Sequence, residues 1–142
     1  MPEYMSTADR PTEKIRCPVH GFIHYSKNER AFIDHAAFRR LKSIRQLALT
    51  CYVYPGAMHS RFEHSLGVME MATRAFDSLA TKHEPKMLRE LSAIPELQEN
   101  TLARSRQVVR LLALLHDIGH PPISMRPRKF CRSPIMKLFL ST

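Results

Sequence analysis

The spacing of apolar residues changes along the first 50 positions of the chain. In residues 15–25 short apolar runs are broken by Pro18 and Gly21, which predicts a short strand, a turn and a second short strand. In residues 35–48 apolar side chains recur every three or four positions with basic residues between them, which predicts an amphipathic helix. Asp34 precedes this helix and is expected to cap its first turn.

A second helix is predicted from about residue 61 to residue 80, after a connector that contains Pro55 and Gly56. One face of this helix is apolar, and we expect that face to be buried. The face consists of Phe62, Leu66, Met69, Ala72, Phe76 and Leu79. Pro85 and Pro95 then bracket a segment that is compatible with one short helix.

A third helix is predicted to begin near Thr101 and to end in an apolar block at residues 111–115, before Gly119 and two prolines. Because this block is apolar on all sides, its last turns are predicted to be buried. The fold class that follows is mainly α, with a short β-hairpin-like segment near the N-terminus.

Composition is consistent with one folded domain. The chain has 142 residues, of which 44% are hydrophobic and 25% are charged, and this excludes a wholly disordered chain. No run of 18 apolar residues and no apolar leader is present, so we expect no membrane span and no secretory signal. The three cysteines are far apart, which favours free thiols and a cytoplasmic protein.

Positive charge is concentrated at the C-terminal end. The formal net charge is +9, and residues 125–142 contain five basic residues and no acidic one. Such a segment is compatible with an anionic partner, including nucleic acid, and equally with a solvated basic tail.

The most informative stretch is LLALLHDIGH at residues 111–120. A carboxylate at the end of an apolar helix needs a cation or several hydrogen-bond donors, and a neighbouring imidazole suits a divalent transition metal. His116 and Asp117 are therefore candidate ligands. The alternative is a histidine that bonds a backbone carbonyl and an aspartate that caps the next turn. His64, 52 residues upstream, is a further candidate if the two helices pack together.

Four blocks of sequence resemble the HD-domain phosphohydrolases, in the same order. The resemblance is closest to the branch of deoxynucleoside triphosphate triphosphohydrolases. The blocks are CPVHGFI (residues 17–23), FRRLKSIRQL (38–47), YVYPGAMHSRFEHSLGV (52–68) and LLALLHDIGHPPIS (111–124). The chain therefore resembles the N-terminal part of an HD-domain helical fold.

The resemblance implies a metal site and a catalytic pair. It implies that His64, His116 and Asp117 ligate a divalent ion (Mn, Mg, Fe or Zn), and that His120 assists catalysis beside Asp117. The implied reaction is hydrolysis of a (deoxy)nucleoside triphosphate with release of triphosphate. Members of the family are often oligomeric, so a homo-oligomer is also implied.

The same resemblance implies three residues that contact substrate. Arg61 matches an arginine that contacts phosphate, whereas Gln46 and Leu47 match residues that contact the sugar. An arginine guanidinium offers a planar fork of donors for phosphate oxygens, which fits the first of these roles.

Departures from the family pattern limit the expected activity. The family's fourth ligand is a later aspartate, but residues 118–142 contain no Asp or Glu. Met125 stands where relatives have a histidine, and Cys17 stands where many have an aspartate. We therefore expect a flexible segment at residues 1–14, a partial HD domain at 15–124 and a tail unlike the family at 125–142, as in a truncated or frame-shifted member. The alternative function is a non-catalytic basic fragment that binds nucleotide, nucleic acid or a protein.

Overall fold

A β-hairpin opens the part of the chain that the structure, a computed structural model, describes, which is residues 11–98 and 100–121. Strand β1 (Glu13–Cys17) pairs antiparallel with β2 (Gly21–Tyr25), in a register that places Ile15 opposite Ile23. Gly21 has a φ of +76°, a conformation that glycine adopts without steric cost, and it ends the tight turn. The predicted strand, turn and strand are therefore confirmed.

A short helix that the sequence analysis did not predict follows the hairpin. Helix α1 (Lys27–Asp34) begins with a capping box, in which the Ser26 side chain accepts a hydrogen bond from the backbone of Glu29 and the Glu29 carboxylate accepts one from the Ser26 backbone. Asp34 is the last residue of α1, so the prediction that it caps a following helix is wrong. His35 takes that place, because its Nδ1 accepts from the Ala37 backbone.

The helix predicted for residues 35–48 is shorter than expected. It consists of α2 (Ala36–Arg39) and the 3-10 helix η2 (Arg40–Ser43), and it ends because Ile44 is extended. The Ile44 carbonyl accepts a hydrogen bond from the backbone of Arg61. Tertiary pairing with the start of the next helix therefore replaces the last predicted helical turn. A second 3-10 turn, η3 (Thr50–Tyr52), lies in the connector.

Helix α3 (Arg61–Ser92) is longer than predicted, because it includes the segment between the two prolines. It bends where His83 leaves helical geometry, two residues before Pro85, since proline cannot donate the backbone hydrogen bond of a regular helix. Most of the predicted apolar stripe is buried or half-buried, as expected. Leu79 is the exception, with 52% of its surface exposed.

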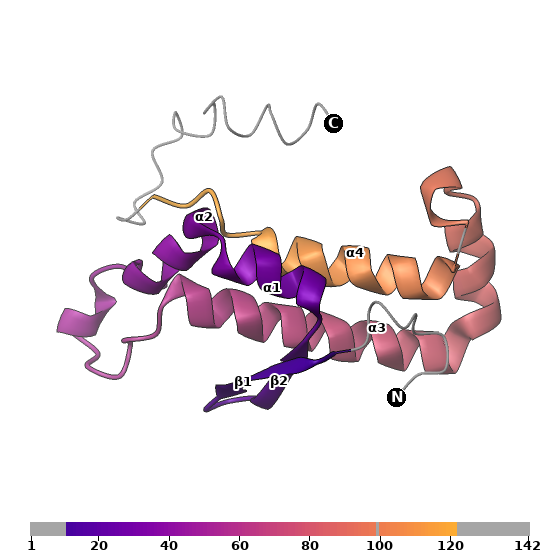
Figure 1. Ribbon diagram of the computed structural model, residues 1–142. Helices are drawn as coiled ribbons and strands as arrows, with labels where there is room; N and C mark the ends of the chain where they lie inside the picture. The colour runs from indigo at the N-terminus through magenta and orange to yellow at the C-terminus, as the bar shows by residue number, and fades with distance from the viewer. Residues whose placement is uncertain (1–10, 99, 122–142) are drawn as a thin grey trace.

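Helix α4 (Thr101–Leu115) runs antiparallel to α3 and lies beside it, after the short 3-10 turn η4 (Pro95–Leu97) (Figure 1). The helix lies where it was predicted in the sequence, but only one of its faces is buried. Leu114 is fully buried, whereas Leu112 is 67% exposed. The prediction of burial on all sides is therefore wrong, since the described segments cover only one face of α4.

The main apolar core joins the hairpin, α1, α2, η2 and the first half of α3 to the end of α4. Its fully or nearly buried members include Ile23, Ile33, Phe38, Leu41, Ile44, Leu66, Met69 and Leu114. The hairpin turn approaches α3 closely at Gly67, where a Cβ atom would lie 3.0 Å from the His20 ring. Across residues 11–121, with residue 99 left aside, no helix has the length and apolar character that crossing a membrane requires.

Candidate metal centre

The antiparallel packing of α3 and α4 brings the first turn of one helix beside the last turn of the other. His64 lies in the first turn of α3, and His116 and Asp117 directly follow the last residue of α4. One potential ligand atom from each of these three residues lies within 4.8 Å of the other two. The rings of His64 and His116 meet edge to face, with their centroids 5.3 Å apart. The three residues singled out by sequence therefore converge.

Asp117 is the buried centre of this cluster. Its Oδ2 atom accepts a hydrogen bond from Nη1 of Arg61 at 2.7 Å and lies 4.0 Å from Nε2 of His64. Its Oδ1 atom lies 3.5 Å from Nε2 of His116 and 3.4 Å from Nε2 of His120. A buried carboxylate is costly unless positive charge or donors surround it, and here the Arg61 guanidinium supplies both.

The His116 ring is oriented by the backbone of its own helix. Its Nδ1 atom lies 2.7 Å from the carbonyl oxygen of Ala113. A carbonyl oxygen can only accept, so Nδ1 carries the proton and Nε2, on the Asp117 side, keeps its lone pair when the ring is neutral. This backbone contact was the alternative to a metal site in the sequence analysis. It is equally the contact that orients a histidine ligand.

His64 has a pKa below the ordinary value for histidine. Burial is the largest cause, and the nearby His116 and Arg61 lower it further, while the Asp117 carboxylate acts in the opposite direction. A lowered pKa favours the neutral imidazole, which is the form that binds metal.

The donor set fits a divalent ion with little adjustment. Atoms that bind one ion at about 2.0–2.2 Å lie no more than about 4.4 Å apart. The largest separation among the three donors is close to this limit, so small side-chain rotations would bring them into range. Two imidazoles and a carboxylate are typical ligands of zinc, iron and manganese.

The two residues expected to contact a sugar, Gln46 and Leu47, lie in the turn that follows Arg45. Arg45 forms an isolated β-bridge with Ser60, and the Gln46 backbone donates to the His59 carbonyl. This pairing places Gln46 near the first residue of α3. Its Oε1 atom is buried and has no hydrogen-bond partner in the described part of the chain, while Leu47 is 46% exposed.

Arg40 is a site residue that the sequence analysis treated as part of a basic helix face. Its guanidinium donates to the carbonyl oxygens of Ile118 at 2.5 Å and His120 at 3.0 Å. These carbonyls belong to the turn that follows Asp117, so Arg40 fixes the backbone that carries His120. Nothing in the local sequence indicates this contact, because it joins residues 80 positions apart.

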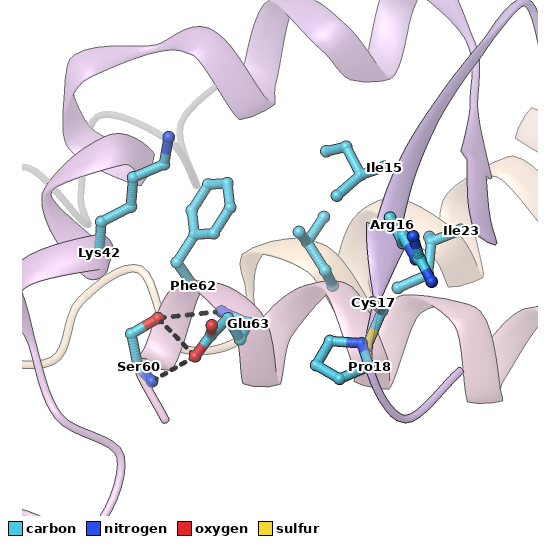
Figure 2. A pocket seen from close by; sticks show the side chains of 10 residues that line it. Ile15, Arg16, Cys17, Pro18, Ile23, Lys42, Ser60, Phe62 and Glu63 are labelled. Carbon is cyan, nitrogen blue, oxygen red and sulfur yellow. Dashed lines mark hydrogen bonds between the residues drawn. The ribbon is translucent and has the colours of Figure 1, made fainter. Parts of the chain in front are cut away.

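A separate hollow lies between the hairpin and the start of α3. Its volume is about 390 Å³, and it is bounded mainly by apolar side chains such as Ile15, Ile23 and Phe62 (Figure 2). At the edge of the hollow, the Lys42 ammonium lies over the face of the Phe62 ring. Neither His64 nor His116 lines this hollow, so it is distinct from the histidine and aspartate cluster.

Comparison with known proteins gives a family match and several relatives. The family described as HD domain matches residues 61–137. The chain is 40% identical over 110 residues to the deoxynucleoside triphosphate triphosphohydrolase SAMHD1 of Bos taurus, covering 78% of this chain and 16% of that protein. It is 33% identical over 126 residues to the SAMHD1 homolog of Dictyostelium discoideum, covering 86% of this chain and 22% of the relative.

A solved structure of a hypothetical protein from Aquifex aeolicus is also similar. It superposes with a TM-score of 0.61 at 28% identity, over 91% of this chain and 33% of the other. The chain thus spans about a fifth or less of the length of the first curated relatives it matches.

Proposed function

The chain belongs to the HD domain family, and on this premise we propose that His64, His116 and Asp117 hold one divalent metal ion that serves hydrolysis of a deoxynucleoside triphosphate. The observation that carries the proposal is the convergence of these three residues from two antiparallel helices. The substrate class is supported by similarity to relatives named as deoxynucleoside triphosphate triphosphohydrolases.

The residues of the site have distinct tasks in this proposal. A bound divalent ion would polarise a phosphoryl oxygen and lower the pKa of water. Asp117 supplies the negative charge of the ligand set, and Arg61, held 2.7 Å from it, is the residue that the family resemblance assigns to phosphate contact. His120, 3.4 Å from Asp117, would carry a proton. Gln46 and Leu47 keep the sugar contact that the family resemblance implies for them.

The small number of metal ligands favours a second function, which is nucleotide binding without turnover. Among the residues that the structure describes, the cluster contains three ligands, and residues 118–142 have no acidic side chain to supply a fourth. Three ligands leave open positions on an ion, but phosphoryl transfer depends on exact placement of the substrate. We therefore expect slow hydrolysis by the 142-residue chain, and nucleotide binding without turnover is the second candidate.

One assay separates the two functions. The purified chain is incubated with dGTP and Mn²⁺, and the released triphosphate is measured. His116→Ala is assayed beside it, with His83→Ala, at an exposed position of α3, as the matched control. Release that needs Mn²⁺ and is lost only in His116→Ala supports hydrolysis. Binding of dGTP and Mn²⁺ without release supports the binding function. Absence of both contradicts the proposal.

A further inference from the structure

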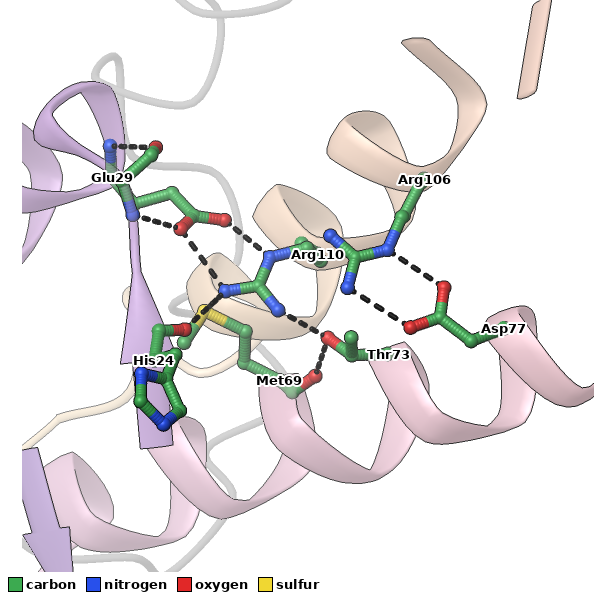
Figure 3. A network of polar contacts seen from close by, with 8 residues as sticks. His24, Glu29, Met69, Thr73, Asp77, Arg106 and Arg110 are labelled. Atoms are coloured by element: carbon green, nitrogen blue, oxygen red, sulfur yellow. Dashed lines mark hydrogen bonds and ion pairs between the residues drawn. The ribbon is translucent and has the colours of Figure 1, made fainter. Parts of the chain in front are cut away.

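A buried arginine on α4 connects the metal-site helix to three other segments of the fold. Arg110 donates from Nε to Oε1 of Glu29 at 2.5 Å and from Nη2 to Oε2 of the same carboxylate at 3.0 Å (Figure 3). Its Nη1 donates to Thr73 Oγ1 on α3 at 2.6 Å, and Nη2 also donates to the His24 carbonyl on β2 at 2.8 Å. One side chain thus joins α4 to α1, α3 and the hairpin.

The partners of Arg110 are themselves fixed. Glu29 completes the capping box of α1 through the Ser26 backbone, and both the Glu29 and Arg110 side chains are less than 10% exposed. Thr73 Oγ1 donates to the Met69 carbonyl in the preceding turn of α3. All three nitrogens of the guanidinium are therefore held by groups that cannot move without disturbing an element. A planar, bidentate contact of this kind sets orientation as well as distance.

The spacing along α4 relates this network to the candidate metal centre. Arg110 lies five residues before Leu115, the last residue of α4, which is about 7.5 Å along the helix axis. Asp117 lies in the turn that continues directly from this helix end, so the rotation and axial position of α4 that Arg110 fixes also set where Asp117 meets Arg61. A rotation or slide of α4 would turn Asp117 and His116 away from His64, which lies on the other helix.

A second ion pair on α4 offers a comparison. Arg106 pairs with Asp77 of α3 at 2.7 and 3.0 Å, one turn further from the metal centre (Figure 3). This pair is more exposed, with 13% and 29% of the two side chains accessible. The Arg106–Asp77 pair joins α4 to α3, whereas Arg110 binds α1 and β2 as well as α3.

We propose that Arg110 is a positioning residue for the metal centre: its contacts with Glu29, Thr73 and the His24 carbonyl set the rotation and axial position of α4 that bring His116 and Asp117 to His64. The metal part of this inference rests on the proposed function. The part that concerns geometry does not rest on it, because the His64 and His116 rings lie close together in the metal-free chain.

The test compares Arg110→Lys with Arg106→Lys in the full chain. Lysine keeps the charge and the attraction to the carboxylate but loses the fork that reaches three partners. Two quantities are measured at a temperature where circular dichroism shows each variant to be folded: the nuclear Overhauser effect between the His64 and His116 rings without metal, and the affinity for Mn²⁺. Glu29→Gln, of nearly the same shape as the native residue, is the second variant, so that the result does not depend on one substitution.

We expect Arg110→Lys and Glu29→Gln to weaken the nuclear Overhauser effect between the His64 and His116 rings. We also expect them to lower the affinity for Mn²⁺ about 10-fold or more, as for other groups that orient metal ligands. We expect Arg106→Lys to change affinity less than about two-fold. The inference is overturned if both variants of the network keep the native ring contact, or if Arg106→Lys disturbs it equally. If the unaltered chain binds no Mn²⁺, the proposed function fails, and the ring contact alone decides the role of Arg110.

Discussion

Arg61 and Asp117 lie 56 residues apart in sequence and form an ion pair at 2.7 Å with both side chains almost fully buried. The pair joins the first residue of α3 to the residue that follows the candidate ligand His116. Removal of one partner from a buried pair leaves an uncompensated charge, which is more costly than loss of an exposed pair.

The first prediction concerns this pair. Arg61→Leu should lower the free energy of unfolding by about 3–5 kcal/mol, because it leaves the Asp117 carboxylate buried without its guanidinium. Arg74→Leu on the same helix removes an exposed pair with Glu70 and should cost less than about 1 kcal/mol. Urea denaturation of both variants measures the difference. Equal losses in the two variants would show that the buried Arg61 pair contributes no more to the free energy of unfolding than the exposed pair.

The second prediction tests which face of α4 is covered. Leu114 is fully buried and Leu112 is 67% exposed, although both belong to the same apolar block. Leu114→Ala should therefore cost about 2–5 kcal/mol of unfolding free energy, whereas Leu112→Ala should cost less than about 1 kcal/mol. Thermal or urea unfolding gives both values. A larger loss in Leu112→Ala would mean that another surface covers this face in solution.

The third prediction concerns the turn after Asp117. Arg40→Met removes both hydrogen bonds to the carbonyls of Ile118 and His120, so the backbone of this turn should open more often. Amide hydrogen exchange at residues 118–120 should become several-fold faster, with little change in global stability because the arginine is exposed. Arg39→Met, at the neighbouring exposed position, is the control. Unchanged exchange in Arg40→Met would exclude the proposed role of this contact.

The fourth prediction follows from the lowered pKa of His64. The imidazole should titrate below the ordinary value of 6.5 in the folded chain, mainly because it is partly buried. The unfolded chain then binds this proton more readily, so His64 should contribute a loss of stability as the pH falls below 6.5 and none well above it. Histidine ring NMR gives the midpoint. Asp117→Asn should lower it further, since that carboxylate raises the pKa of His64. A midpoint above 6.5 would contradict the burial of the ring.

The sequence was sufficient for the parts of the fold that depend on local pattern. The hairpin follows from the interruptions at Pro18 and Gly21, and α4 follows from its apolar block and the residues that stop it. Helix α1 was missed although a signal was present, because Ser26 and Glu29 have the spacing of a capping box. The apolar residues of this eight-residue helix all fall at positions 31–33, so no repeated apolar spacing marks it otherwise.

The errors arise where tertiary contacts override local pattern. Ile44 continues the helical period of the residues before it, yet it is extended because its carbonyl binds the Arg61 backbone. Leu112 and Leu79 are apolar but exposed, and no periodicity distinguishes a face that is covered from one that is not.

For the candidate site, sequence analysis identified His64, His116 and Asp117 as candidates, and the structure places them together. It did not identify the residues that hold them in place. Arg40 and Arg110 act on partners about 80 positions away, and a single sequence gives no information on such pairs. An arginine within an apolar run, as at residue 110, is the one local sign that a buried carboxylate must be near.

The central claim, that three residues from two helices form one metal site, is tested most directly by calorimetric titration of the 142-residue chain with Mn²⁺. The account predicts one ion per chain, lost in Asp117→Ala and in His64→Ala and unchanged in the exposed control His83→Ala. Absence of binding by the unaltered chain, or binding that survives both substitutions, would contradict it.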